Sequence, residues 1–541
     1  MFETSRIGRP GFPVQRSVVM ACDGMVATSQ PLATEVGVSM LKKGGNAFDA
    51  AIATALTLSV VEPMSTGIGG DAFFLYACAG DDTIYGVNGS GRCPRQLTLE
   101  ALQQAGIDDI PKRGLGSVTV PGAIDAFSKV HQRHGALSFG ELFEPAIHYA
   151  TEGFPVSEVI ASQWQATAPL LSQYPSSARA YLIDGKAPRP GDVHRQPDLA
   201  RSLKTLAAEG RDAFYQGDIA RRIVEFSQAN GGYFELDDFA SHTTEWVEPI
   251  GADYQGYRVL ELPPNGQGIT ALIALNVLEG FDLAAMEYGS AAYYHLLIEA
   301  TKQAFTDRSR YIADPACATL PVSGLLSKAY AASRRTEVAV DRAGDFIPGD
   351  PVAFSNTVYI SCVDRQRNVV SLIYSVFQSF GSGVVAGDTG ICLQNRGSGF
   401  VAEADHPNAL APGKRPFHTI IPSMILKDGR PWVCYGVMGG DMQAQGHIQV
   451  AINLIDFGMN VQEAMEAPRY RILGGRTVAL ERDIPHPVRQ ELEDMGHDLF
   501  PYGQLPPGTP YGGGQAILID DERGVLHGGS DHRKDGCAIG Y

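Results

Sequence analysis

The sequence predicts a mixed α and β protein in which helices cover two β-sheets. Three observations support this: apolar helical segments before residue 345, β-rich runs after residue 356, and an ordinary globular composition. Of its 541 residues, 44% are apolar and 19% are charged. The strand runs are separated by Gly-rich turns. The expected order is therefore helix-rich first and strand-rich last.

The first elements follow from hydrophobic spacing and capping residues. Residues 31–45 predict a helix with one apolar face that stops at a Gly pair. Asn46 is a candidate N-cap for a second helix over 48–62, which is apolar almost all round and is therefore expected to be buried. A tight loop at 67–71 then leads to a strand over 72–77.

The middle of the chain, 115–345, has mostly helical spacing, and 290–313 is its clearest helix, with Ser290 as N-cap. Residues 341–353 are rich in Asp, Gly and Pro, as in an exposed loop. Two β-rich runs, 357–364 and 369–377, then predict a hairpin.

A second hairpin, 424–440, is expected to turn at Asp428-Gly429. Residues 445–470 have helical spacing. The last 60 residues alternate short strands and turns.

Composition excludes several classes of function. A net charge of −17 argues against a nucleic-acid partner. No apolar run approaches the roughly 18 residues of a membrane span, and the N-terminus lacks an apolar signal region, so a cytoplasmic location is expected. The eight Cys show no zinc-site spacing and are expected to be reduced. No metal and no cofactor are expected.

Thr357 stands at the start of a strand, directly after the flexible loop. If the preceding peptide bond were cut, its free α-amino group could act as the general base for its own hydroxyl. A base tethered in this way is positioned at little entropic cost. The plainer alternative is a Thr that is present for its β-propensity.

Five ordered blocks resemble the gamma-glutamyltransferase family. They span 25–73, 380–395, 414–424, 436–440 and 530–541. The resemblance implies a four-layer αββα sandwich of the N-terminal-nucleophile type and self-cleavage between Asn356 and Thr357. The products would be a large subunit, 1–356, and a small subunit, 357–541, which together build one composite globular domain. The resemblance leaves open a homodimer of such heterodimers.

The resemblance also implies roles for four residues. Thr357 would attack an amide carbonyl and carry the acyl group, which water or an amine then accepts. Gly439 and Gly440 match the pair whose backbone N–H groups form the oxyanion hole, although a simple turn after a strand is the plainer alternative. Ser375 matches a hydroxyl position that orients the nucleophile.

The pocket departs from the glutamyl pattern at three places, of which the first two concern arginines. Arg92 lies two residues after the position of the family's carboxylate-binding Arg. In the run Asn395-Arg396-Gly397-Ser398-Gly399, Gly399 replaces the acid that binds the substrate's α-amino group, and Arg396 adds positive charge. Asn395 and Arg396 are therefore candidate substrate-binding residues in a pocket suited to a carboxylate without an amino group. For Arg92 and Arg396, a surface charge or a structural ion pair is the alternative.

A third departure is His418-Thr419, which replaces the family's Ser pair; both are candidate pocket residues. Only residues 401–413 separate Phe400 from Lys414, a segment shorter than the lid of lidded members, which favours water as acceptor.

The expected function is hydrolysis of γ-glutamyl, glutathione-like amide bonds through an acyl-enzyme on Thr357. One alternative is an acylase for des-amino, carboxylate-bearing amides of the glutaryl or oxamate kind. A non-catalytic, unprocessed binding scaffold is an alternative of another class. A phosphate- or nucleotide-binding enzyme has only Gly-rich loops in its favour.

Overall fold

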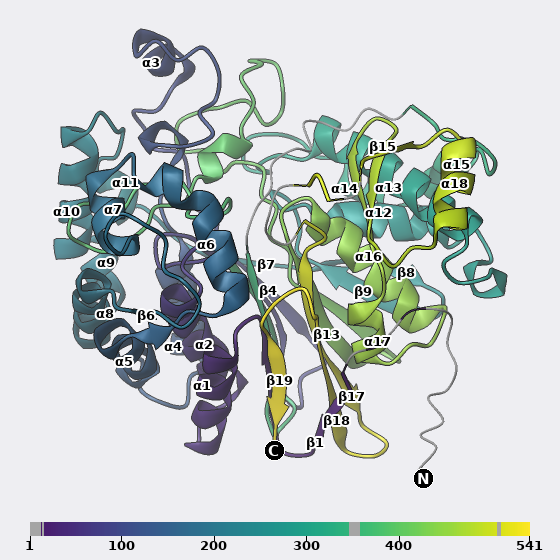
Figure 1. The fold of residues 1–541 in the computed structure, drawn as a ribbon, viewed down its shortest axis with the longest axis horizontal. Helices are drawn as coiled ribbons and strands as arrows, with labels where there is room; N and C mark the ends of the chain where they lie inside the picture. Colours follow the sequence, from purple (N-terminus) through teal and green to yellow (C-terminus); the bar gives the residue numbers. More distant parts are fainter. Residues whose placement is uncertain (1–11, 13, 15, 346–356, 502, 506–509) are drawn as a thin grey trace.

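The computed structural model describes residues 12, 14, 16–345, 357–501, 503–505 and 510–541. Two seven-stranded antiparallel sheets form its centre (Figure 1). The first sheet has the order β1 (Val19–Ala21), β18 (Val525–Ser530), β17 (Gly513–Asp520), β13 (Arg430–Met438), β12 (Ser423–Lys427), β9 (Tyr257–Glu261), β8 (Ile250–Tyr254). The second has the order β19 (Cys537–Gly540), β2 (Met25–Thr28), β10 (Val358–Val363), β11 (Val369–Ser375), β3 (Asp71–Ala77), β4 (Ile84–Asn88), β7 (Glu245–Val247).

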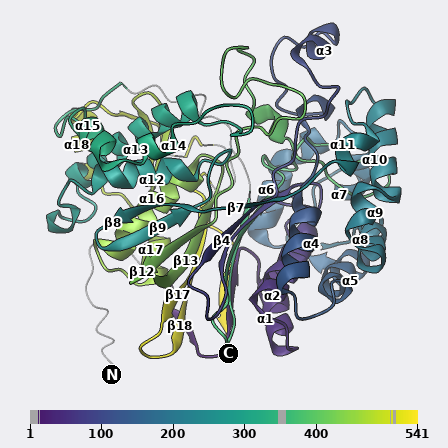
Figure 2. The same cartoon turned by 180° about the vertical axis from the view of Figure 1, so that it is seen from behind.

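Helices cover the outer side of each sheet, as Figures 1 and 2 show from opposite directions. On the side of the second sheet lie α1 (Pro31–Lys42), α2 (Ala47–Val61), α4 (Ala123–His134), α5 (Glu144–Glu152), α6 (Glu158–Leu171), α7 (Pro175–Tyr181), α8 (Pro197–Glu209), α9 (Arg211–Tyr215), α10 (Asp218–Ala229) and α11 (Leu236–Ala240). On the side of the first sheet lie α12 (Gly268–Leu278), α13 (Ala291–Tyr311), α16 (Met442–Ile455) and α17 (Val461–Glu466).

Short elements complete the described part. They are the helices α3 (Leu99–Gln104), α14 (Val322–Leu325), α15 (Lys328–Arg335) and α18 (His486–Asp494), the pair β5 (Phe154–Pro155) and β6 (Val193–His194), and the sheet of β14 (Tyr470–Gly474), β15 (Thr477–Leu480) and β16 (Asp498–Leu499).

Strand alternation produces separate apolar layers. In β10, Tyr359 points into the layer between the two sheets, where it meets Ile373 and Met424. Its neighbour Ile360 points to the opposite side, into the layer beneath α2. A third layer lies between the first sheet and α12, α13 and α16. The arrangement is the expected αββα sandwich.

The strongest sequence signals are confirmed. Asn46 caps α2 through a capping box with Asp49, and every residue of α2 is buried. Ser290 caps α13 by accepting from the Tyr293 amide. The runs around 357–377 form the β10–β11 hairpin, and β12 and β13 turn at Asp428 and Gly429, both at positive φ.

Other segments differ from the prediction. The described part of the middle of the chain holds five strands: β5 and β6 pair with each other, and β7, β8 and β9 complete the edges of the two large sheets. The helix expected over 445–470 starts earlier and is two helices, α16 and α17, separated at Gly458, whose φ is +54°. The last 60 residues include a helix, α18. Of the predicted loop 341–353, residues 346–353 lie outside the described residues.

Both sheets contain strands from either side of residue 357. Strand β10 lies between β2 and β11, and β12 lies between β13 and β9. Within the described residues, no helix has the length and hydropathy needed to cross a bilayer.

Candidate active site

Thr357 lies directly before β10 and is fully buried. Its Oγ1 donates to the Oγ of Ser375 at 3.2 Å, and that Oγ accepts from the Phe377 amide at 2.7 Å. Strand pairing accounts for the contact, since Val358 lies opposite Tyr374 in the β10–β11 ladder. The structure thus brings Thr357 and Ser375 together. Asn356 lies outside the described residues.

Gly439 and Gly440 form the turn between β13 and α16. Their φ values are +123° and +63°, a region that residues with a Cβ rarely adopt. The Gly440 carbonyl accepts from the Gln443 amide at 3.0 Å. The Gln443 side chain then reaches Thr357, with its Nε2 3.4 Å from Oγ1. The turn is therefore linked to the hydroxyl by one side chain.

Gln267 fixes this turn from the other side. Its Nε2 donates to the carbonyls of Gly440 at 2.8 Å and Thr419 at 2.7 Å. Its Oε1 accepts from Arg308 at 2.8 Å, and Arg308 also forms a 2.6 Å ion pair with Asp441. All of these groups are buried, so the network is rigid where the turn meets the pocket.

A pocket of about 680 Å³ opens beside this network. Its lining combines charged, aromatic and small residues: Asp109, Ile110, Lys112, Arg308, Ser309, Ile312, Phe377, Gln378, Ser398, Gly399, Phe400, Val401, Ala402, Glu403, His406, Asn408, Phe417, Thr419 and Asp441. Part of the short segment 401–413 is thus one wall. His406 ties it to α13 through the Ser309 carbonyl, at 2.9 Å.

Arg396 lies behind the Phe377 and Thr419 walls of the pocket. Its guanidinium carbon is 4.4 Å from the centre of the Phe377 ring, and Nη1 donates to Thr419 Oγ1 at 2.7 Å. Nε and Nη2 are buried and have no hydrogen-bond partner among the described residues. Burial lowers the pKa of Arg396 to about 9, against the opposing charge of Asp71, so the group stays cationic at neutral pH.

The side chain of His418 forms a hydrogen bond with Asp71, which does not line the pocket, whereas Thr419 lines the pocket. His418 Nε2 donates to Asp71 Oδ2 at 3.0 Å, and its ring packs against Phe73. Burial, followed by the charge of Arg396, lowers the pKa of His418 to about 4, so the ring is neutral at pH 7. This tie fixes the backbone beside Thr419.

The Arg396 turn leaves no room for an acid at residue 399. A Cβ on Gly399 would lie 2.8 Å from the Phe417 carbonyl oxygen, closer than real Cβ contacts allow. Asn395 uses its amide within the protein, where it bonds Gln378 and donates to the Lys112 carbonyl. It therefore shapes the wall that Gln378 and Lys112 line.

Arg92 is not among the residues that line this pocket. Its Nη2 forms a 3.0 Å ion pair with Glu245, which also pairs with Arg415 at 2.7 Å. Glu245 and Arg415 line a different pocket. The structure therefore does not bring Arg92 together with Arg396 and Thr419.

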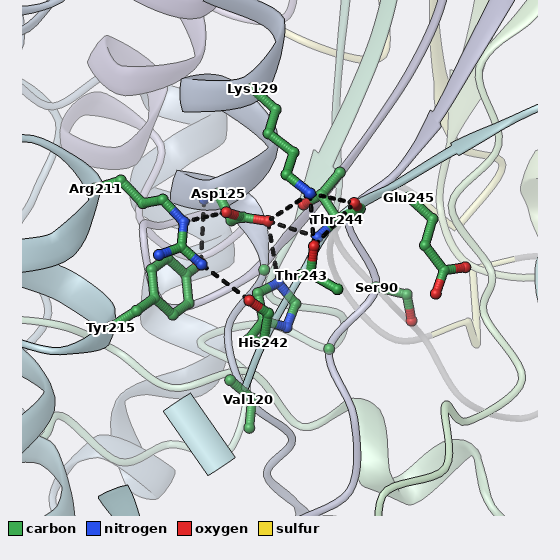
Figure 3. A network of polar contacts seen from close by, with 12 residues as sticks. Ser90, Val120, Asp125, Lys129, Arg211, Tyr215, His242, Thr243, Thr244 and Glu245 are labelled. Atoms are coloured by element: carbon green, nitrogen blue, oxygen red, sulfur yellow. Dashed lines mark hydrogen bonds and ion pairs between the residues drawn. The ribbon is translucent and has the colours of Figure 1, made fainter. Parts of the chain in front are cut away.

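A network of ion pairs around the buried side chain of Asp125 lies near Glu245 (Figure 3). The Asp125 carboxylate lies between Arg211 and Lys129 and also accepts from the Thr244 amide. Burial would raise the pKa of Asp125, but the Arg211 and Thr244 hydrogen bonds outweigh it and lower this pKa. The Tyr215 hydroxyl accepts from the Asp125 amide and donates to Pro121 O.

One group in the described part has metal-ligand chemistry, formed by His295, Glu299 and His497. His295 Nδ1 and His497 Nε2 are 2.8 Å apart and share a hydrogen bond, and Lys302 forms a 2.9 Å ion pair with Glu299. These groups are bonded to one another, although His497 Nδ1 has no partner among the described residues, and the Lys302 ammonium opposes a divalent cation. The arrangement fits a buried hydrogen-bonded cluster.

The gamma-glutamyltranspeptidase family model matches residues 33–541. The chain belongs to the gamma-glutamyltranspeptidase family. It is 42% identical over 532 residues to the glutathione hydrolase-like YwrD proenzyme of Bacillus subtilis (strain 168), covering 96% of this chain and 99% of that one. It is 34% identical to the acylase ACY 1 proenzyme of Pseudomonas sp. (strain SE83), covering 97% and 96%.

Among solved structures, this family member resembles the cephalosporin acylase from Bacillus halodurans. The TM-score is 0.92 at 42% identity, and the match covers 100% of this chain and 99% of that one. The αββα sandwich is thus the N-terminal-nucleophile fold of this family's structures, and the relatives are amide-cleaving enzymes named as proenzymes.

Sequence reasoning missed Gln267, Arg308 and Gln443. Two are amides without a perturbed charge or a metal-ligand pattern, and Arg308 occurs among other basic residues near the end of a helix. The only signal for Gln443 was its position three residues after Gly440, in the first turn of a helix that follows a Gly pair.

Proposed function

We propose that this family member is a self-cleaving amide hydrolase with Thr357 as its nucleophile. The observation that carries the proposal is the hydrogen bond between Thr357 and Ser375, together with the Gly439-Gly440 turn, which Gln443 connects to Thr357. A hydroxyl, a hydroxyl that orients it and a Gly-rich turn at positive φ are the parts that an acyl-transfer site needs.

Self-cleavage would use the same hydroxyl. Thr357 Oγ1 attacks the carbonyl carbon of residue 356, the C–N bond breaks, and the proton from Oγ1 goes to the departing nitrogen. Water then hydrolyses the ester, which leaves a carboxylate on residue 356 and a free amine on Thr357. That amine is the general base for every later turnover, in which Oγ1 attacks the substrate amide and water releases the acyl group.

For the acyl group, γ-glutamyl compounds of the glutathione kind are the first candidate, because a relative is named glutathione hydrolase-like. A second candidate is a des-amino, carboxylate-bearing group such as glutaryl. Buried, cationic Arg396 has two unpaired nitrogens among the described residues, and no acid fits at residue 399. A carboxylate would compensate this guanidinium, whereas an α-ammonium would be repelled by it.

The proposal is tested with Thr357→Ala and Thr357→Ser. On a denaturing gel we expect two bands for the wild type and one full-length band for Thr357→Ala, which should also lose amide hydrolysis. Thr357→Ser keeps a hydroxyl and should still process, more slowly. Full-rate hydrolysis by intact Thr357→Ala would refute the role of this residue.

A further inference from the structure

Gln443 is the second residue of α16 and is completely buried. Its side chain spans two groups that belong to different elements. Oε1 accepts from the Ile421 amide at 3.0 Å, just before β12, and Nε2 lies 3.4 Å from Thr357 Oγ1, just before β10. The backbone N–H of Gln443 also donates to Gly440.

The orientation of this amide is fixed by its partners. A backbone N–H can only donate, so the oxygen of the Gln443 side chain must face Ile421. The NH₂ group then has to face Thr357. Gln443 is therefore a donor to the nucleophile oxygen.

The hydroxyl of Thr357 thus has two neighbours with different roles. It donates its proton toward Ser375 and accepts from Gln443. When the general base removes the proton, Oγ1 becomes an acceptor only, and it carries negative charge until its bond to the carbonyl carbon forms. A prepositioned N–H donor favours that charge over the neutral hydroxyl, in a site without bulk water.

We propose that Gln443 is a catalytic residue that stabilises the developing alkoxide of Thr357, both in self-cleavage and in turnover. This inference rests on the proposed nucleophile. The same donor acts again when the acyl-enzyme breaks down, because the alkoxide of Thr357 is then the leaving group. Ser375 orients the hydroxyl before the reaction, whereas Gln443 acts on the charge that forms during it.

The decisive substitution is Gln443→Glu. The carboxylate keeps an oxygen for the Ile421 N–H but replaces the donor near Thr357 with an acceptor. We expect kcat, per processed molecule at pH 8, to fall about 100-fold with KM within about threefold, as when an oxyanion donor is lost. Self-cleavage should slow in parallel; a folded Gln443→Glu chain that never processes supports the same role.

A pH profile separates this role from a structural one. A buried carboxyl has a raised pKa, and once protonated it can donate again. The ratio of variant to wild-type kcat should therefore rise as the pH is lowered from 8 to 5.5. Gln443→Met has a side chain of similar shape without a donor, so its kcat should fall by the same factor and its ratio to the wild-type kcat should not change with pH. If the Gln443→Glu variant does not fold, the kcat of Gln443→Met still tests the proposed role.

Gln445→Glu is the matched control. Gln445 lies in the same helix and also accepts from a backbone amide, Ile472, while it donates to a carbonyl rather than to Thr357. Its kcat should stay within about threefold of wild type. If the processed Gln443 variants keep kcat within threefold while Thr357→Ala is inactive, Gln443 is not catalytic; if Thr357→Ala is active, the proposed nucleophile itself is wrong.

Discussion

At the scale of single residues, we expect the specificity of the pocket to depend on where its positive charge lies. Arg396 is buried against Phe377 and Thr419, whereas Arg92 is a third exposed, with 32% of its side chain accessible, and is paired with Glu245. Burial of an incompletely paired guanidinium has a free-energy cost that a bound carboxylate would offset. Substrate selection is therefore expected to depend on Arg396.

Arg396→Gln tests this expectation. With glutaryl-p-nitroanilide, we expect kcat/KM to fall about 10- to 100-fold, the value of a charge-assisted hydrogen bond. With γ-glutamyl-p-nitroanilide the loss should be smaller, because repulsion of the α-ammonium disappears as well. The ratio of kcat/KM for the glutaryl substrate to kcat/KM for the γ-glutamyl substrate should therefore be smaller in Arg396→Gln than in the wild type. Arg92→Gln is the control and should leave the ratio of the two kcat/KM values unchanged. If Arg92→Gln lowers this ratio and Arg396→Gln does not, the substrate carboxylate is bound by Arg92.

The sequence pointed to Thr357 as the candidate nucleophile and to Gly439 and Gly440 as its candidate partners, because the proposed chemistry requires particular residue types in a recognisable order. It could not identify Gln443 or Gln267, whose roles come from two or three hydrogen bonds to residues far away in the chain. It also could not show that Arg92 would meet Glu245, 153 positions away. Such pairings depend on how the elements pack.

At the scale of elements, capped helices and tight hairpins were predictable because their signals are local. Asn46 and Ser290 cap α2 and α13, and Asp428-Gly429 turns a hairpin. Strands β7 and β9 depend instead on distant partners, because they pair with β4 and β12, which lie far away in the sequence. Strand β8 pairs with the adjacent β9 through a turn at Gln255 and Gly256, both at positive φ.

The junction between α4 and the β7 strand depends on Asp125 (Figure 3). Arg211 and the Thr244 amide bond its carboxylate, and Tyr215 connects the same position to Pro121. The next residue, Gly122, donates to Asp71, the partner of His418. The junction thus supports the backbone behind the pocket.

Asp125→Asn should lower the free energy of unfolding by about 3 kcal/mol at pH 7, because it leaves Arg211 without its buried partner. Urea unfolding in the unprocessed Thr357→Ala background measures this for a single chain. The carboxylate is favoured by folding, so the difference should shrink as pH falls below about 4, where Asp protonates in the unfolded chain. Asp212→Asn removes the exposed partner of Arg211 and should cost less than about 0.5 kcal/mol.

At the scale of the whole molecule, the proposed cleavage would divide one fold between two chains. Strand β10, from the part after residue 356, lies between β2 and β11, and β9, from the part before it, pairs with β12. The apolar layer between the sheets draws on both parts, for example Phe73 and Tyr359. Neither part retains a complete sheet or core alone, so the two subunits should stay associated after processing.

This interleaving predicts a specific difference in thermal unfolding. Processed protein should elute as one peak that contains both subunits, and its Tm should rise with protein concentration, because unfolding releases two chains from one folded unit. The unprocessed Thr357→Ala chain has the same fold in one piece, so its Tm should not depend on concentration. Scanning calorimetry of both proteins over a 50-fold concentration range makes the comparison. Release of one subunit in a separate, earlier transition would show that one part can fold alone, contrary to the mixed order of strands in both sheets.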